Sequence, residues 1–166
     1  MAHLVGSALP PDLVERFSQR DLSRRLGVGL PFVTVDGEGR PHPMLLSYLE
    51  LRAYDARTLG LVIVARSTSA RNLAERHVGT LILVEPDAVV YVKTRAVDGP
   101  LPVEGGEAFG LGFFLLEVEQ VLEDAAADWE SGTRITGSIR YTPAPTLETP
   151  WARATLAALA APRARA

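Results

Sequence analysis

The chain has 166 residues, of which 47% are hydrophobic and 22% charged, a composition typical of one globular domain. Its net charge of −3 provides no basic surface for nucleic acid or an anionic membrane, and the absence of cysteine excludes disulfides and thiolate metal sites. Its histidines, at positions 3, 42 and 77, have no metal-ligand spacing, so we expect no metal site. The first residues lack the cationic and apolar regions of a signal peptide, which favours a cytoplasmic protein.

Residues 1–29 are predicted to form an N-terminal helical segment. Pro10 and Pro11 open a helix that we expect to break near Gln19 to Asp21, because the apolar residues change face there. Gly27 and Gly29 end the helical region, and His3 is placed in a disordered end. We expect this helix to pack on the outside of the core.

Residues 30–142 are predicted to form the β-rich core. Pro31–Asp36 is a strand, and the turn residues that follow it indicate a hairpin whose return strand covers 40–52. His42 lies between two prolines on this return strand, where a histidine is more often an edge residue than a catalyst.

The central stretch reads as strand, short helix, strand. Leu59–Ala65 is an unbroken apolar run typical of a strand buried on both faces, and Val78–Val84 is a second such strand. Between them lie the hydroxyls of Ser67, Thr68 and Ser69, any of which can cap the helix, whose predicted inner face carries Ala70, Leu73, Ala74 and His77. With Arg71 in the first turn, this helix start could bind an anion, or it could be an ordinary cap with a solvated arginine.

Further strands and a second helix are predicted after this unit. Strands are expected over Ala88–Val97, Leu111–Glu123 and Arg134–Tyr141, and Asp98–Gly110 is rich enough in glycine and proline to be a loop. Trp129 falls in another loop, where docking on the core is the simpler interpretation and covering a ligand is the other. Residues 148–161 form a helix that Thr149 caps.

The central stretch resembles the pyridoxamine 5′-phosphate oxidase-like family of FMN-binding split barrels. Members carry a pattern close to Ser-x-Lys-x-x-Asn-Leu between two strands, which Ser67, Asn72 and Leu73 match, and often a Gly-x-Pro such as the one at Gly39. The resemblance extends over roughly residues 30–122. It implies a homodimer with FMN at the subunit interface, where the phosphate and ribityl chain would be bound by Ser67, Thr68, Ser69, Arg71 and Asn72.

The chain departs from the family pattern where positive charge is usual. Ser69 stands in place of the lysine, and Met44 and Leu49 occupy the positions of two cations that help hold the flavin phosphate in the oxidases. Arg71, Arg66 and Arg52 are the candidate replacements. The C-terminal tryptophan–arginine signature of true pyridoxamine phosphate oxidases is also missing, so that substrate is not expected.

We therefore predict a mainly β protein with six to seven antiparallel strands in a split barrel, short peripheral helices, and a single domain over 1–166. The competing fold is a parallel α/β sheet, which would need longer helices between strands. Because Leu59–Ala65 and Leu81–Val84 are apolar on both faces, we expect a twofold partner to cover the surplus. Two functions stay open: an FMN-dependent oxidoreductase of unknown substrate and catalytic residues, and a non-catalytic dimeric barrel that binds another small ligand or none.

Overall fold

The computed structural model describes residues 2–86, 88–126, 128–130 and 135–161. The strands are β1 (Ala2–Gly6), β2 (Val28–Val35), β3 (Pro41–Ser47), β4 (Leu51–Ala53), β5 (Thr58–Val64), β6 (Val78–Glu85), β7 (Ala88–Pro102), β8 (Leu111–Ala125) and β9 (Ile139–Arg140). The helices are α1 (Pro11–Phe17), α2 (Leu22–Arg25), α3 (Thr68–Arg76) and α4 (Pro150–Ala160), and 3₁₀ turns occur at η1 (Tyr48–Glu50), η2 (Glu107–Phe109) and η3 (Asp128–Glu130). None of these helices is long and apolar enough to span a membrane.

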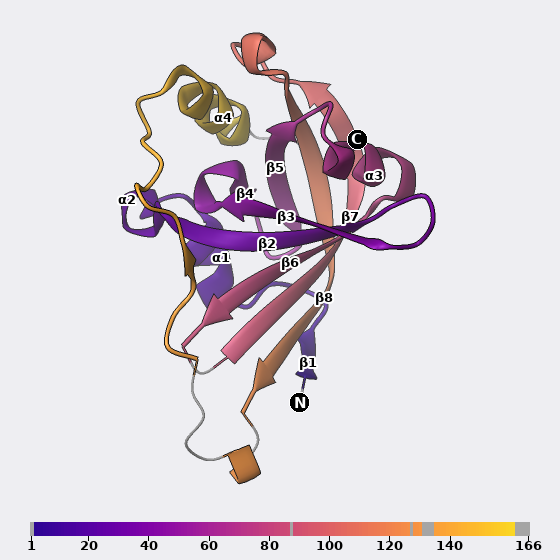
Figure 1. Cartoon of the computed structure of the whole chain (residues 1–166), viewed down its shortest axis with the longest axis vertical. Coiled ribbons are helices and arrows are strands. Elements are labelled where there is room, and N and C mark those ends of the chain that lie inside the picture. The colour runs from indigo at the N-terminus through magenta and orange to yellow at the C-terminus, as the bar shows by residue number, and fades with distance from the viewer. Residues whose placement is uncertain (1, 87, 127, 131–134, 162–166) are drawn as a thin grey trace.

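The strands form one antiparallel sheet in the order β3-β2-β6-β7-β8-β5-β4, with β1 added to β8 and β9 to β2. Every recorded pairing is antiparallel, which confirms the predicted architecture and rules out the parallel α/β alternative. The seven strands of the main path agree with the predicted number, and β1 and β9 extend it to nine. The hairpin β2–β3 crosses the long strands β7 and β8 steeply, so the sheet is strongly curled (Figure 1).

The sheet curls until its two end strands almost meet. β3 and β4 stand at opposite ends of the strand order, yet only the three residues of η1 separate them in the chain. No ladder joins β3 to β4 in the described part of the chain, so the barrel is open along this line. This is the split of a split barrel, and its interior is filled by large buried side chains such as Phe32, Leu61 and Phe114.

The turn η1 corrects the predicted continuous strand over 40–52. The Ser47 N–H donates to Glu50 Oε2 at 2.6 Å and the Ser47 hydroxyl donates to the same oxygen at 3.0 Å, within a capping box that starts a new turn. A Ser-x-x-Glu pattern therefore ended the strand where the alternation of apolar residues alone suggested that it continues.

A second apolar layer covers the outside of β5. Val62, Phe113 and Leu115 point away from the barrel interior and pack against Ala154 and Leu159. Those last two residues belong to α4, whose N-cap is Thr149 as predicted. The apolar outer face of β5, which we assigned to a twofold partner, is thus covered at least in part by the chain itself, and the homodimer stays a prediction.

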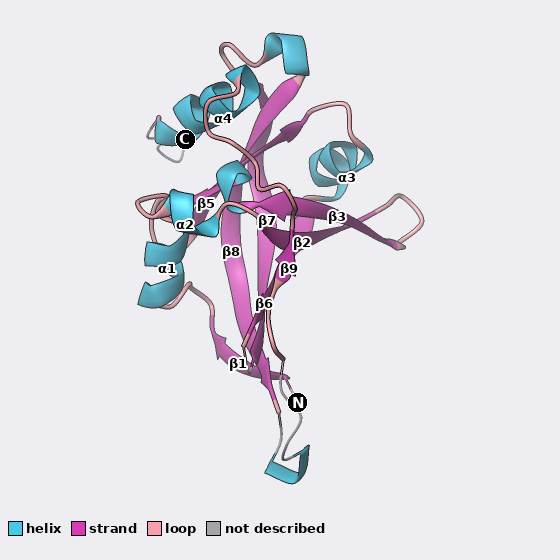
Figure 2. Ribbon diagram, turned by 60° about the vertical axis from the view of Figure 1, so that its left-hand side comes forward, coloured by secondary structure: helices cyan, strands magenta, loops and turns pink. Residues whose placement is uncertain are grey.

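The chain ends differ from the sequence-based expectation. The predicted helical segment over 1–29 begins with a strand: residues 2–6, which include His3 of the expected disordered end, form β1 and pair with β8. His3 lies 3.9 Å from Glu123. The predicted strand 134–141 is reduced to β9, because only Ile139 and Arg140 reach β2, while residues 131–134 lie outside the described part of the chain. α1 and α2 pack at one side of the barrel, with the predicted break between them, and α3 lies on the opposite side (Figure 2).

Two loop predictions also need correction. β7 continues to Pro102, because register shifts after Asp98 place Gly99 and Pro100 in a bulge, where proline removes no ladder bond. Trp129 does not dock on the core: its side chain is 82% exposed in η3, beyond the end of the sheet (Figure 1).

The packing of α4 on β5 depends on Gly60. A Cβ atom there would lie 2.7 Å from the Tyr54 hydroxyl oxygen and 2.9 Å from Leu159 Cδ2, closer than ordinary contact. We expect Gly60→Ala to lower the free energy of unfolding by about 1–3 kcal/mol through overpacking, measured by urea denaturation. Gly137→Ala is the control, since nothing lies within 4 Å of a Cβ at Gly137. Equal stability of the two variants would contradict this description of the α4 contact.

Candidate functional site

The helix α3 begins as the sequence predicts, directly after β5. Ser67 is its N-cap, and the Ser67 hydroxyl oxygen accepts a hydrogen bond from the Ala70 N–H at 3.1 Å. The helix ends at His77, which adopts a left-handed conformation with φ of 64°. Ala74 and His77, expected on the inner face, are exposed. The inner face is more polar than predicted, because the buried positions include Ser69 and Asn72.

The predicted flavin-binding residues are divided between two faces of α3. Thr68 and Arg71 are exposed and Ser67 is half-buried, and the spacings 67/71 and 68/71 place them on one side of the helix. Ser69 and Asn72, also three apart, are buried against the sheet. The structure therefore brings Ser67, Thr68 and Arg71 together at the surface and separates them from the other two.

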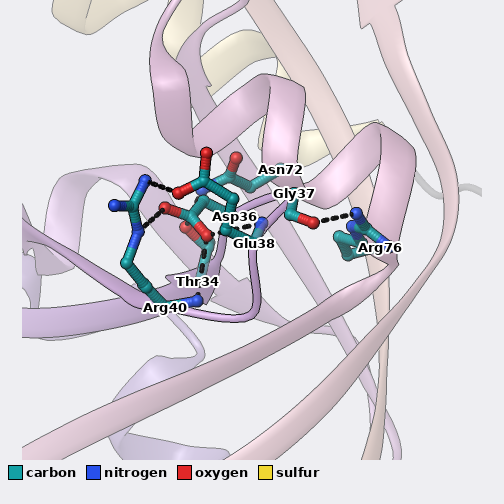
Figure 3. Close-up of polar contacts among 7 residues, drawn as sticks. All are labelled: Thr34, Asp36, Gly37, Glu38, Arg40, Asn72 and Arg76. Atoms are coloured by element: carbon teal, nitrogen blue, oxygen red, sulfur yellow. Dashed lines mark hydrogen bonds and ion pairs between the residues drawn. The ribbon is translucent and has the colours of Figure 1, made fainter.

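Asn72 anchors the helix to the β2–β3 hairpin. Its Nδ2 donates to Thr34 Oγ1 at 3.0 Å (Figure 3). The Thr34 hydroxyl in turn donates to the His42 carbonyl oxygen at 3.3 Å. Arg76 adds a second bond by donating from Nη2 to the Gly37 carbonyl oxygen at 2.7 Å. His42 itself lies on β3, an end strand of the main path, as predicted for an edge residue.

Oppositely charged side chains pair with one another at the tip of this hairpin. Asp36 Oδ1 accepts the backbone N–H groups of Arg40 and Glu38, both at 2.9 Å, and the Arg40 side chain pairs with both acids (Figure 3). The backbone N–H of Arg40 is the main cause that lowers the pKa of Asp36. The tip is therefore a self-contained ion cluster that supports α3.

A pocket of about 370 Å³ opens beside the start of α3, within the size range of ligand sites. Its walls are mainly apolar and come from β5, η2, the start of β8, and α4: Val62, Ile63, Val64, Ala108, Phe109, Leu111 and Trp151. Its polar lining consists of Glu50, Arg66 and Thr155. Arg66 directly precedes the N-cap Ser67, so this edge of the pocket lies next to the start of α3, although Ser67, Thr68 and Arg71 are not among the described residues that line it.

Two polar groups in the pocket were not found from the sequence. The Thr155 side chain is 1% exposed, and its Oγ1 has no hydrogen-bond partner in the part of the chain that the structure describes. Glu50 is partly buried, and this burial raises the pKa of its carboxyl group although the Ser47 hydrogen bonds oppose the rise. The Ser-x-x-Glu spacing could have identified Glu50 as a capping residue, but only the return of α4 over β5 brings Thr155 to it.

Two of the three candidate replacement cations are available at the site. Arg66 and Arg71 are exposed, and neither makes an ion pair with the residues that the structure describes. Arg52 does not belong to the site, because its guanidinium lies over the Tyr54 ring, 6.0 Å from the ring centre, and lines a different hollow beside α2. Among the described side chains, no group of three or more His, Asp or Glu is placed to hold a metal ion.

The positions of the missing family cations lie in or against the core. Leu49 is fully buried, Ser69 is buried beneath α3, and Met44 packs against the main apolar cluster. Among the described residues, Arg66 and Arg71 are the candidate sources of positive charge at this site.

No family model matches the sequence, and no curated protein matches it either. Solved structures do resemble the fold. An FMN-binding protein from Syntrophomonas wolfei subsp. wolfei superposes with a TM-score of 0.53 at 13% identity, over 70% of this chain and 88% of that one. A putative pyridoxamine 5′-phosphate oxidase from Lactobacillus delbrueckii gives 0.52 at 15% identity, over 73% and 98% of the two chains.

A third structure, of Group A Streptococcus HupZ, gives a TM-score of 0.51 at 9% identity, over 80% of this chain and 99% of the other. The chain has the split-barrel fold. The predicted resemblance is thus confirmed for the fold. At these sequence identities, the similarity establishes the fold alone. The three structures also differ in description, so the ligand and the reaction have to be argued from the site.

The raised pKa of Glu50 predicts a pH-dependent stability. In the unfolded chain this carboxyl loses its proton near its ordinary value of 4.5, and in the folded chain at higher pH, so stability falls as the pH rises through the folded value. We expect Glu50→Gln, which keeps the acceptor oxygen for Ser47, to show a smaller loss of unfolding free energy between about pH 5 and pH 8. Urea denaturation at both pH values measures it. Parallel curves for the two proteins would contradict an ionisable, desolvated Glu50.

Proposed function

We propose that this protein binds FMN in the pocket between β5 and α4 and acts as an FMN-dependent oxidoreductase. The observation that carries the proposal is a ligand-sized apolar pocket next to a helix start, where neither Arg66 nor Arg71 makes an ion pair with the described residues. This arrangement occurs on a fold that an FMN-binding protein shares.

The residues present fit the chemistry of a flavin nucleotide. The apolar walls, with Phe109 and Trp151 among them, suit a planar aromatic ring. Arg66 and Arg71 can form charge-assisted bonds with a phosphate, and the first N–H groups of α3 have no acceptor within the helix. Ser67 and Thr68 add hydroxyl groups on the same side of α3.

When bound, FMN would supply hydride transfer, and the chain would supply binding, orientation and exclusion of water. The buried residues Ser69 and Asn72 would contribute by holding α3 in place. No catalytic residue of this chain is assigned, and the substrate and electron donor stay open.

A non-catalytic split barrel that binds another small ligand, or none, is the second candidate. The observation that favours it is the burial of Leu49 and Ser69, since neither position can present a cation in the way that the family does. The cytoplasmic location expected from the sequence is likewise a prediction, which fractionation of expressing cells would test.

The first experiment is the visible absorption spectrum of the purified protein, followed by identification of any chromophore that heat releases. FMN released in stoichiometric amount would support the flavoprotein. A colourless protein that binds neither added FMN nor riboflavin would remove the flavin proposal and leave the second candidate.

Substitution of the arginine on α3 tests the phosphate contact. Hydrogen bonds to a charged group contribute about 1.5–3 kcal/mol, so Arg71→Ala should weaken FMN binding about ten- to a hundredfold. The affinity for riboflavin, which lacks the phosphate, should fall far less in this variant, and titration followed by flavin fluorescence would measure both affinities. Arg153→Ala is the control, because Arg153 is an exposed arginine of α4 outside the pocket lining. Unchanged affinity of Arg71→Ala for both flavins would remove Arg71 from the site.

We also propose a homodimer that covers the mouth of the pocket. Val64 and Phe109 line this mouth and are each 39% exposed, an apolar rim that a second copy would bury. Sedimentation at micromolar concentration should return twice the chain mass, and Phe109→Glu should shift it toward the monomer. Leu4→Glu, on β1 at the other end of β8, should not. A monomer mass for the unmodified protein would refute the dimer.

A further inference from the structure

The buried hydroxyl of Thr155 is unexplained by the fold. It lies on α4, is almost completely shielded from solvent, and has no hydrogen-bond partner among the described residues. A buried hydroxyl without a partner is costly, and apolar residues of similar shape would fill the same space without that cost. Since Thr155 also lines the pocket, a molecule inside it is the candidate partner for this hydroxyl.

Glu50 presents a second polar group to the same space. Both bonds that Glu50 receives from Ser47 end on Oε2, so Oε1 is left for a ligand. The charged or ionisable groups around Glu50 are few: Tyr141, whose pKa is raised by its own burial and then by the Glu50 charge, and Arg66, which lines the pocket. Burial favours the protonated form of Glu50, which can donate as well as accept.

The polar groups lie at two ends of the pocket. β4 pairs with β5 so that Leu51 faces Leu61, which places Glu50 level with Val62. β5 then continues to Val64, about 7 Å further along at the usual rise per residue, before the chain turns to Arg66. The pocket therefore has a hydrogen-bonding end beside η1 and α4, and a cationic end beside α3.

We propose that Glu50 and Thr155 bind the hydrogen-bonding edge of an uncharged planar heteroaromatic ring, while Arg66 holds the ligand's negative charge at the opposite end. This inference rests on the proposed function, because the flavin ring system is such a ring and its imide edge offers both a donor and acceptors. An anionic group would be repelled from the Glu50 end, so the two ends orient the ligand.

Three probes separate the contributions of ring and phosphate. Lumiflavin carries the ring alone, riboflavin adds the ribityl chain, and FMN adds the phosphate. Thr155→Val removes only the hydroxyl and should weaken all three about three- to tenfold, the value of one neutral hydrogen bond. The melting temperature of the free variant should be unchanged or higher, because an unpartnered hydroxyl is removed. Arg66→Ala should weaken FMN alone.

Glu50 is tested by its protonation. The affinity of the unmodified protein for lumiflavin should fall as the pH rises from about 5 to about 8, while Glu50→Gln, which keeps a donor and an acceptor, should bind equally well at both. Arg153→Ala is again the control. Because lumiflavin has no phosphate, its pH response does not depend on Arg66 or Arg71.

The outcomes distinguish the two proposals. Normal FMN binding with no effect of Thr155→Val and no difference between the pH responses of the unmodified protein and Glu50→Gln would overturn this inference and leave the proposed function intact. Lumiflavin binding that responds to both variants, with FMN no tighter than lumiflavin, would support the ring contacts of Glu50 and Thr155, overturn the Arg66 contact, and count against a flavin nucleotide as the physiological ligand. Failure of all three probes to bind the unmodified protein would overturn both.

Discussion

The short connection between β3 and β4 is the constraint on which the rest of the structure depends. These strands stand at opposite ends of the sheet, and three residues join them, so the sheet has to curl until its ends meet. The Ser47–Glu50 capping box makes this sharp connection possible by satisfying the backbone where the strand stops. Curling in turn creates the enclosed space that Phe32, Leu61 and Phe114 fill.

The same connection shapes the candidate site. Glu50 cannot leave the turn without breaking the box, so its carboxyl is held at the wall of the pocket, partly out of water. α4 then packs over the outer face of β5, where Gly60 permits close approach, and brings Thr155 to the same wall. A residue needed for the barrel thereby becomes available for ligand chemistry.

The helix α3 shows how one short motif can serve both structure and binding. Its inner face carries Asn72, whose bond to Thr34 fixes the helix on the β2–β3 hairpin, and its outer face presents Arg71 and the hydroxyl of Thr68. The match at Ser67, Asn72 and Leu73 therefore concerns residues that cap α3 or pack it against the sheet, in addition to any role in binding. The departures at Met44, Leu49 and Ser69 affect charge alone, which is why the fold is shared while the ligand has to be argued separately.

The order of the elements, the hydroxyl cap of α3 and the antiparallel character of the sheet could be read from the sequence, because they follow from local periodicity and capping chemistry. Local patterns did not predict contacts between distant segments, such as the pairing of β1 with β8 and the extension of β7 along β8 through a proline bulge. They also did not predict that Trp129 is exposed. The site followed the same division. Arg66 and Arg71 were recognisable as charges near a helix start. Helical periodicity was needed to place Asn72 on the buried face of α3 and Arg71 on its exposed face. Only tertiary packing decided that Glu50 and Thr155, more than a hundred residues apart, line one pocket, because no local signal specifies which face of a barrel a C-terminal helix will cover.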